Sequence, residues 1–307
     1  MSRIERISTA AGLRAAVAAA RDRGDRVALV PTMGSLHDGH LSLVEIAAQH
    51  ADTVVVSVFV NPTQFDRPDD LATYPRDLAG DEAALAGLGP SVPVLVFAPS
   101  VEEVYPRASR TTVHVAGLTD HLCGAKRPGH FDGVATVVTK LLHLATPDLA
   151  VFGRKDYQQL QVIRRMVADL DLPVRIVDAP TSREHDGLAR ASRNRRLSPP
   201  DRVAARVIPL ALRAAVLAAR AARAKGQLAD PAVVRAGAAA VLSTVPELDL
   251  DYLEVADVAS LAPLDGPPTG HEGFLVAVAA SLGSVRLIDN VEVGHADDEQ
   301  RLLDATA

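Results

Sequence analysis

The chain has 307 residues, of which 48% are hydrophobic and 23% charged, with a formal net charge of −6. These values are typical of a globular chain, and the length favours a larger domain plus a smaller one. The negative charge, and an aromatic fraction of 3% without Trp, argue against nucleic acid or an anionic membrane as a partner.

The cysteine content and the first residues bear on the compartment. Cys123 is the only cysteine, so no disulfide can form within the chain, and we expect Cys123 to serve packing. Charged residues interrupt every apolar stretch within residues 1–26, so neither a signal-peptide core nor a membrane span is predicted there. We therefore expect a cytoplasmic protein.

The first two-thirds of the chain alternates short β-branched runs with longer amphipathic ones. The predicted strands lie at 27–30, 53–60, 94–97, 149–152 and 174–177. The predicted helices lie at 41–50, 81–88, 136–145 and from Asp156 to about Leu170. This alternation is typical of βαβ units with a parallel sheet, whose central strands are apolar along their whole length.

The pattern changes after Pro180. A polar loop is followed by predicted helices at 199–225 and 231–242 and by strands at 250–255, 274–279 and 285–289. We therefore predict an α/β fold, with a Rossmann-like domain over residues 1–181 and a smaller α+β domain over residues 182–307. The tail after Val293 has no clear periodicity, and we assign no element to it.

The segment PTMGSLHDGH, residues 31–40, follows a predicted strand and leads into a helix. In an open parallel sheet, ligands bind beyond the carboxyl ends of the strands, and a helix N-terminus there offers backbone N–H groups to phosphate. Gly34 and Gly39 would allow close approach of the backbone, and His37 and His40 could fall on one side of the turn. Alone, the two histidines could equally be surface residues or a helix cap. The strand–loop–helix setting favours a nucleotide site.

HDGH resembles the HxGH signature of nucleotidyltransferases and class I aminoacyl-tRNA synthetases, and the longer segment is similar to that of the pantothenate synthetases. Further segments of that family recur in order: FVNPTQF (59–65), YPR (74–76), RPGHFDGV (127–134) and FGRKDYQQL (152–160). DGLARASRNRRLS (186–198) agrees in part, and DYLE (251–254) fits the second domain of the family. The resemblance covers about residues 26–290. It implies an enzyme that activates pantoate with ATP as pantoyl adenylate and then joins it to β-alanine, releasing pyrophosphate and AMP.

The resemblance also implies roles for individual residues. His37, His40, Lys155 and Arg193 would be catalytic and contact the phosphates. The implied ATP-binding residues are Met33, Gly34, Ser35, Leu36, His37, Asp38, Gly39, His40, Gly153, Arg154, Lys155, Asp156, Ser182, Arg190, Ala191, Ser192 and Arg193. Lys155 stands at a predicted helix start, where the helix dipole disfavours a cation, so an anionic ligand would explain it. Asp156 could equally serve as a helix cap.

The implied substrate residues are Gln64, Gln159, Asn61 and His130. Amides suit pantoate, which bears a carboxylate and hydroxyls, because they both donate and accept hydrogen bonds. His130 lies in a Pro/Gly-rich stretch that we expect to form a mobile flap. Taken alone, either glutamine would more often be a surface residue, and His130 would more often be structural. Mg²⁺ is expected with ATP, held mainly by the phosphates, and a homodimer is implied by the resemblance.

The sequence departs from the family pattern near the implied nucleotide. The family usually has Glu at Arg154, apolar residues at Ser182 and Arg190, and Ser at Ala191. These departures keep open the alternative of a degenerate homologue that binds nucleotide or pantoate with weak or no turnover. Another adenylate-forming or nucleotidyl-transferring enzyme of the HxGH type is a second alternative, against which Gln64 and Gln159 argue.

Overall fold

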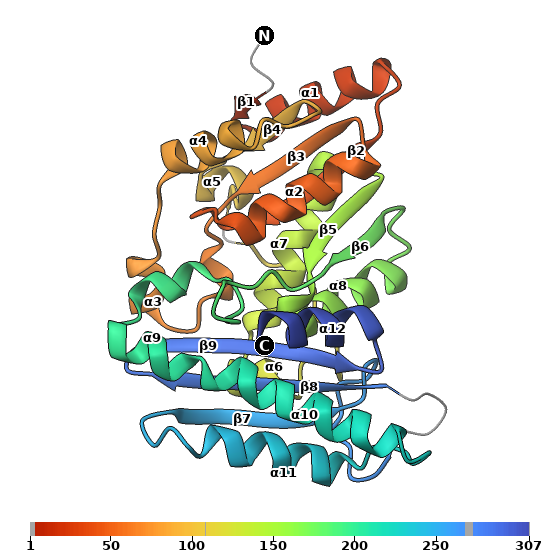
Figure 1. Cartoon of the computed structure of the whole chain (residues 1–307). Helices are drawn as coiled ribbons and strands as arrows, with labels where there is room; N and C mark the ends of the chain where they lie inside the picture. Colours follow the sequence, from red (N-terminus) through yellow and green to blue (C-terminus); the bar gives the residue numbers. More distant parts are fainter. Residues whose placement is uncertain (1–3, 108, 268–272, 307) are drawn as a thin grey trace. The chain divides into compact units, whose positions relative to one another are not determined.

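The computed structural model describes residues 4–107, 109–267 and 273–306 (Figure 1). The contacts of the chain divide it into two units. Unit 1 consists of Met1–Ala116, Arg127–Arg154 and Gln159–Ala179, and unit 2 consists of Gly117–Lys126, Lys155–Gln158 and Pro180–Ala307. Each unit has its own sheet.

Unit 1 contains a parallel sheet with the strand order β1-β4-β3-β2-β5-β6. The strands are β1 (Ile4–Ile7), β2 (Val27–Thr32), β3 (Thr53–Val58), β4 (Val94–Phe97), β5 (Leu149–Gly153) and β6 (Arg175–Ala179). The central strand β3 is buried along nearly its whole length, because both faces of a parallel sheet are covered by helices. The α/β prediction is therefore confirmed.

Helices α1, α2, α4 and α7 pack on this sheet, and further short helices lie among the first 145 residues. Their bounds are α1 (Ala10–Asp22), α2 (Asp38–His50), η1 (Pro62–Gln64), α3 (Pro68–Thr73), α4 (Leu78–Leu88), α5 (Val101–Val104), α6 (Leu122–Lys126) and α7 (His130–Ala145), of which α6 belongs to unit 2. Helix α2 packs on β2, β3 and β5, whereas α7 packs on β2 and against α1. The buried face of α2, with Leu43, Val44 and Ala47, meets Ala28 and Val30 of β2 in one apolar cluster.

After β5 the chain forms η2 (Arg154–Asp156) and α8 (Tyr157–Asp169). Unit 2 then adds η3 (Ser192–Arg196), α9 (Pro199–Ala205), α10 (Val207–Arg223) and α11 (Pro231–Leu242). Its antiparallel sheet has the order β7-β8-β9, formed by β7 (Asp249–Ala256), β8 (Phe274–Leu282) and β9 (Val285–Val293). Helices α10 and α11 pack on each other and on this sheet. Unit 2 is thus the α+β fold that the sequence predicted.

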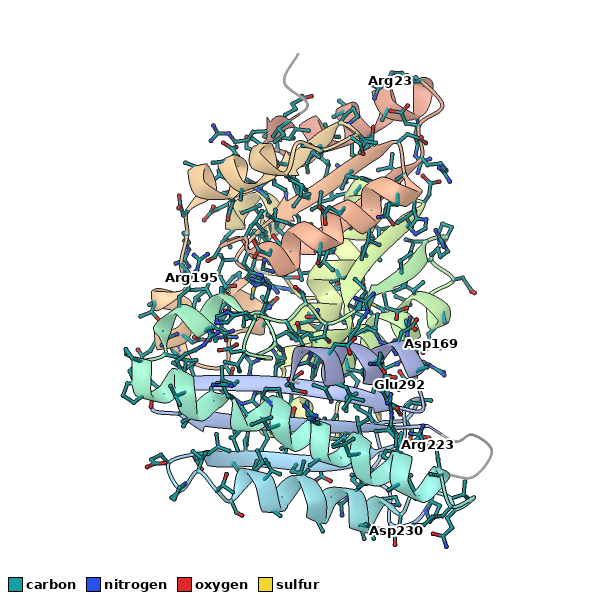
Figure 2. The ribbon with its side chains drawn as sticks, in the orientation of Figure 1. Arg23, Asp169, Arg195, Arg223, Asp230 and Glu292 are labelled. Atoms are coloured by element: carbon teal, nitrogen blue, oxygen red, sulfur yellow. The ribbon has the colours of Figure 1, made fainter. Side chains whose placement is uncertain are left out.

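The sequence prediction was wrong in two places in unit 2. The helix expected over 199–225 is divided at Arg206 into α9 and α10. The tail forms α12 (Ala296–Ala305), whose buried face is partly acidic: Glu299 is 2% exposed and binds Arg220 at 2.8 Å and Arg223 at 2.6 Å. Figure 2 labels Arg223 near the end of α10. Because the buried face of α12 is partly acidic, the sequence has no apolar periodicity there that would predict the helix.

Ion pairing decides the charge of that buried carboxyl group. Burial raises the pKa of Glu299. Hydrogen bonds outweigh this effect and bring the pKa below its ordinary value; the donors are Arg223, the backbone N–H of Gly294 and Arg220. Glu299 therefore stays ionised and joins α12 to α10.

Among the described residues, the chain has no helix with the length and apolar character that crossing a membrane requires.

Candidate active site

A buried carboxylate shapes the loop after β2. Gly34 has a φ of +79°, and a Cβ there would lie 2.9 Å from Oδ2 of Asp81, so this position needs glycine. Asp81 is 3% exposed and accepts the backbone N–H groups of Ser35 at 3.0 Å and Leu36 at 2.6 Å. Two donors of the predicted ATP loop are thus engaged by the chain itself. From the sequence alone, Asp81 is predicted to lie in a helix and has no evident role, because a lone acidic residue in a helix normally faces solvent.

His37 and His40 lie at the start of α2 with their rings stacked. The ring centroids are 4.0 Å apart and the ring planes are inclined by 27°, which confirms that both side chains fall on one side of the turn. Nδ1 of His37 accepts the N–H of Gly39 at 3.1 Å and caps the helix. A neutral His37 therefore carries its proton on Nε2, where it is a hydrogen-bond donor.

The strand order reverses between β2 and β5, with β3 and β4 on one side and β6 on the other. Ligands of open parallel sheets bind at such a reversal, beyond the carboxyl ends of the strands. The loop 33–37 follows β2, and Gly153 is the last residue of β5. The N-terminus of α2, with its backbone N–H groups and positive dipole end, begins here. This edge of unit 1 therefore favours a phosphate-bearing ligand.

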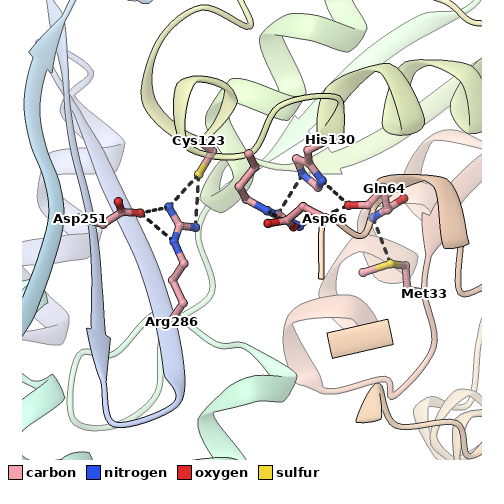
Figure 3. A network of polar contacts seen from close by, with 8 residues as sticks. Met33, Gln64, Asp66, Cys123, His130, Asp251 and Arg286 are labelled. Carbon is pink, nitrogen blue, oxygen red and sulfur yellow. Dashed lines mark hydrogen bonds and ion pairs between the residues drawn. The ribbon is translucent and has the colours of Figure 1, made fainter. Parts of the chain in front are cut away.

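Asn61 and Gln64 are joined beyond the end of β3. Asn61 is 1% exposed, and its Nδ2 donates to Oε1 of Gln64 at 3.0 Å and to the carbonyl of Gly133 at 3.1 Å. Its Oδ1 accepts the hydroxyl of Tyr105 at 2.9 Å. Nε2 of Gln64 lies 3.1 Å from Sδ of Met33 (Figure 3). The structure thus brings together three predicted site residues, and the buried Asn61 orients the amide of Gln64.

The residues expected in a flap are attached to the Gln64 loop. His130 is the first residue of α7, and its Nδ1 lies 2.7 Å from the carbonyl oxygen of Gln64. A guanidinium nitrogen of Arg127 lies 3.2 Å from Nε2 of His130. Because the guanidinium can only donate, Nε2 accepts and Nδ1 donates to the carbonyl. Arg127 also binds Asp66 at 2.7 Å (Figure 3), so this stretch is held by directed polar contacts.

Of the residues that follow β5, Arg154 and Gln159 belong to unit 1. The side chain of Arg154 is buried, and its Nε lies 3.5 Å from Oδ2 of Asp178 at the end of β6. The departure at Arg154 therefore places a charge-paired side chain between neighbouring strand ends. Gln159 is half-buried in the first turn of α8.

Gln158, the neighbour of Gln159, belongs to unit 2 and has a different environment. It is 6% exposed, and its Nε2 donates to the carbonyl oxygens of Leu118 at 2.8 Å and His121 at 2.7 Å. No pattern in the sequence separates these two adjacent glutamines. The contacts separate them, because Gln158 satisfies backbone groups of the segment 117–126.

Lys155 and Asp156 lie in η2 and also belong to unit 2. Nζ of Lys155 is 3.9 Å from Oδ2 of Asp156. Lys155 is only partly exposed, with 22% of its side-chain surface accessible. Both residues precede the first turn of α8, where the positive dipole end favours an anion.

The predicted ATP loop of unit 2 runs from Ser182 to η3. The side chain of Arg190 is directed back into this loop, because its Nε donates to the carbonyl of Arg183 at 3.1 Å. The backbone N–H of Arg190 donates to the carbonyl of Ser182 at 2.9 Å. Ala191 directly precedes η3, which begins with Ser192 and Arg193.

A carboxylate that the sequence analysis did not single out orders η3. Oε1 of Glu184 accepts Nδ2 of the buried Asn194 at 2.7 Å, and Oε2 accepts Arg202 at 2.8 Å. Burial raises the pKa of Glu184, but the hydrogen bonds from Arg202 and Asn194 outweigh it and lower the pKa below its ordinary value. Glu184 therefore stays ionised at neutral pH and fixes the backbone that carries Ser192 and Arg193.

The chain is similar to known proteins along most of its length. The family model described as pantoate-beta-alanine ligase matches residues 5–292. A pantothenate synthetase of Paramagnetospirillum magneticum is 52% identical over 292 residues, which cover 94% of this chain and 97% of the relative. The crystal structure of pantothenate synthetase from Thermus thermophilus is 47% identical with a TM-score of 0.84, covering 94% of this chain and 99% of that one.

A further solved structure is more distant and carries ligands. It is a pantoate-beta-alanine ligase from Francisella tularensis, complexed with beta-gamma ATP and beta-alanine. It is 30% identical with a TM-score of 0.72, covering 94% of this chain and 97% of that one. The likeness to these proteins includes residues of both units.

Proposed function

Because this chain belongs to the pantoate-beta-alanine ligase family, we propose that it condenses pantoate with β-alanine to pantothenate, using ATP. The observation that carries this conclusion is the 52% identity over 94% of this chain and 97% of a pantothenate synthetase. The likeness gives no support to the alternative of a homologue without turnover.

In the first half-reaction, a carboxylate oxygen of pantoate attacks the α-phosphorus of ATP, and the bond to pyrophosphate breaks. Negative charge builds on the phosphoryl oxygens, so donors must be aimed at them. We assign this task to the N-terminus of α2, to Nε2 of His37 and to the stacked ring of His40, since these groups gather at the carboxyl end of β2. Lys155 and Arg193 are assigned as further cationic donors on the family resemblance.

In the second half-reaction, the neutral amine of β-alanine attacks the acyl carbon. The bond to AMP breaks, and the amine nitrogen loses a proton. The acyl adenylate is a mixed anhydride that water would hydrolyse, so the site must exclude water while the intermediate waits for the amine. The Francisella tularensis relative was crystallised with beta-alanine, which supports the same second substrate for this chain.

For pantoate we propose Gln64 and Gln159 as ligands, with Asn61 and His130 beside them. The support comes from unit 1, where Asn61 and His130 both contact Gln64, through its side chain and its carbonyl. Two amides can donate to the carboxylate of pantoate and accept from its hydroxyls without adding charge.

For ATP we propose the residues after β2 and β5 together with the loop 182–193, as the resemblance implies. We propose that Mg²⁺ accompanies ATP, because this ion keeps several waters and usually binds through substrate phosphates. Within residues 4–107, 109–267 and 273–306, no three His, Cys, Asp or Glu side chains gather as metal ligands, and we assign no residue to the metal.

Three further expectations stay proposals. They are the domain boundary at residue 181, a homodimer and a cytoplasmic location. The family resemblance supports the homodimer, the end of β6 at Ala179 supports the boundary, and the single cysteine of the chain supports the cytoplasmic location.

Mass spectrometry of the protein mixed with ATP and pantoate alone tests the proposed function. We expect a pantoyl adenylate that persists until β-alanine is added and then gives pantothenate and AMP. Pantothenate formed without any adenylate, or ADP in place of AMP, would refute the proposed mechanism.

A further inference from the structure

Strand β9 carries buried polar side chains on both of its faces. Its apolar residues that enter the core of unit 2 are Val285, Leu287, Val291 and Val293. Since side chains alternate along a strand, Asp289 shares this core-facing side, whereas Asn290 faces the other way. Asp289 is 3% exposed and Asn290 is 4% exposed. A charged residue therefore replaces an apolar one in the alternating pattern of β9.

Asp289 binds Arg183, which lies in the proposed ATP loop. The pair is bidentate, with nitrogen–oxygen distances of 2.7 and 3.0 Å and side chains that are 2% and 6% exposed. Nη1 of Arg183 also donates to the carbonyl of Gly187 at 3.0 Å. A buried ion pair adds little stability over an apolar pair, so fixing one conformation is the better explanation for it. On the core side, β9 thus holds the loop that leads to Ser192 and Arg193.

On its other side, β9 holds the segment that carries Lys155. Nδ2 of Asn290 donates to the backbone carbonyl of Lys155 at 2.7 Å. Glu292, on the same side of the strand, lies 3.2 Å from the hydroxyl of Tyr157. These contacts join residues 155–158 to β9 within unit 2. They also place the backbone of a proposed catalytic residue under the control of a buried amide.

On the side that carries Asn290 and Glu292, β9 also contacts the segment that contains Cys123. Arg286 binds Asp251 at 2.6 Å, and its guanidinium nitrogens lie 3.5 and 3.6 Å from Sγ of Cys123 (Figure 3). Cys123 is buried and in contact with the hydroxyl of Tyr252 at 3.2 Å. Burial raises the pKa of the Tyr252 hydroxyl well above its ordinary value, and the neighbouring Cys123 raises it further. Through these bonds Arg286 contacts neither the Lys155 segment nor the ATP loop. In this respect Arg286 differs from Asp289 and Asn290.

We propose that Asp289 and Asn290 are positioning residues of the adenylation step. Asp289 sets the ATP loop through Arg183, and Asn290 sets Lys155 through its carbonyl oxygen. The inference rests on the proposed function for the roles of Lys155 and Arg193. Its physical basis is that a donor displaced by about 1 Å from the reacting phosphate can cost as much as a hundredfold in rate.

The test compares three variants of neighbouring β9 residues. Asn290→Asp removes the donor to Lys155 at nearly constant volume, and Asp289→Asn weakens the bond to Arg183. Val291→Ala is the control, because Val291 is fully buried in the apolar core and touches neither loop by hydrogen bonds. All three should lower the melting temperature, so stability alone does not separate them.

The kinetic readout separates positioning from stability. Asn290→Asp should lower the rate constant of pantoyl adenylate formation by about 10- to 100-fold while leaving the KM for pantoate within about twofold. Asp289→Asn should mainly raise the KM for ATP, by about tenfold. Val291→Ala should change neither. Equal losses of adenylation in Asn290→Asp and Val291→Ala would overturn the proposal.

Asp289→Asn leaves the charge of Arg183 buried without its carboxylate, which can prevent folding. The double variant Arg183→Met/Asp289→Leu removes both charges and should fold, and it should show the same rise in the KM for ATP. A double variant with the parental KM for ATP would overturn the role of Asp289.

Hydrogen exchange and a double-mutant cycle complete the test. Exchange should rise in residues 154–158 for Asn290→Asp and in residues 182–194 for Asp289→Asn, whatever the activity. In a Lys155→Ala background, Asn290→Asp should cost less than about twofold further, because residues acting through one another are not additive. Full additivity, or unchanged exchange, would overturn the proposal. A parent protein that forms no pantoyl adenylate would instead refute the proposed function.

Discussion

The imidazole rings of His37 and His40 stack with their centroids 4.0 Å apart at the N-terminus of α2. His37 is also the cap of this helix through its Nδ1. The two rings therefore support each other sterically, so loss of one ring removes a packing contact that orients the other.

The first prediction concerns this pair. His40→Ala should lower the rate of adenylate formation by about two to three decades, the loss expected when one preorganised donor to transition-state charge is removed. The double variant His37→Ala/His40→Ala should be less impaired than the sum of the single losses. Single-turnover measurements with ATP and pantoate give these rates. His50→Ala, at the other end of α2, is the control and should keep the parental rate.

The second prediction concerns Lys155. Lys155→Ala should fall in the same range of about two to three decades, because the developing phosphoryl charge loses a cationic donor. Lys225→Ala serves as control, since Lys225 is exposed after the end of α10. A folded Lys155→Ala protein with a near-parental adenylation rate would remove Lys155 from the catalytic set.

The third prediction separates three glutamines. Gln64→Ala and Gln159→Ala should raise the KM for pantoate more than the KM for ATP, because each amide is assigned to pantoate. Gln158→Ala should instead lower the free energy of unfolding by about 1–3 kcal/mol, since it leaves backbone carbonyl groups without their donor. Steady-state kinetics and urea unfolding of the three variants give the comparison. An equal rise of the KM for pantoate and the KM for ATP in Gln64→Ala would contradict the assignment of Gln64 to pantoate.

The fourth prediction concerns the departures in the ATP loop. Nε of Arg190 is bound to the carbonyl of Arg183, so we expect Arg190 to order the loop and not to replace the hydroxyl that Ala191 lacks. A hydrogen bond to a charged group contributes about 1.5–3 kcal/mol, so Ala191→Ser should lower the ATP requirement by about tenfold or more. Arg190→Leu should leave that gain unchanged. A gain below about threefold, with ATP use weakened by Arg190→Leu, would mean that Arg190 compensates.

The fifth prediction concerns the ion pair of Asp66 and Arg127. Burial raises the pKa of Asp66, but the hydrogen bond and charge of Arg127 outweigh it, so the pKa lies below its ordinary value of 3.8. A carboxyl group whose pKa is lowered by folding stabilises the fold above its unfolded pKa. That stability is lost as the pH falls through the folded value.

Asp66→Asn should therefore lower the free energy of unfolding at neutral pH, and the difference from the parent should shrink below about pH 4. Urea unfolding at a series of pH values measures this, with Asp22→Asn at an exposed position as control. A difference that stays constant down to acid pH would show that Asp66 acts through packing and not through its charge.

The sequence by itself determined the α/β class, the strands β2 to β6 of the parallel sheet and the family. Strands β3 and β4 are buried on both faces, so their apolar runs are local signals that need no knowledge of the partner. The HDGH segment is likewise contiguous, and its strand–loop–helix setting predicts where it lies. The edge strand β1 has two charged residues among its four and was not predicted, since an edge strand needs no apolar run.

The tertiary structure decided which polar residues support the site. Asp81, Gln158 and Asn290 hold backbone groups of segments that are 37 to 135 residues away along the chain. The same holds for α12, whose buried Glu299 needs the arginines of α10 to be stable inside the fold. A buried polar side chain is recognisable only with its partner, because burial without one costs free energy and no local pattern records the pairing.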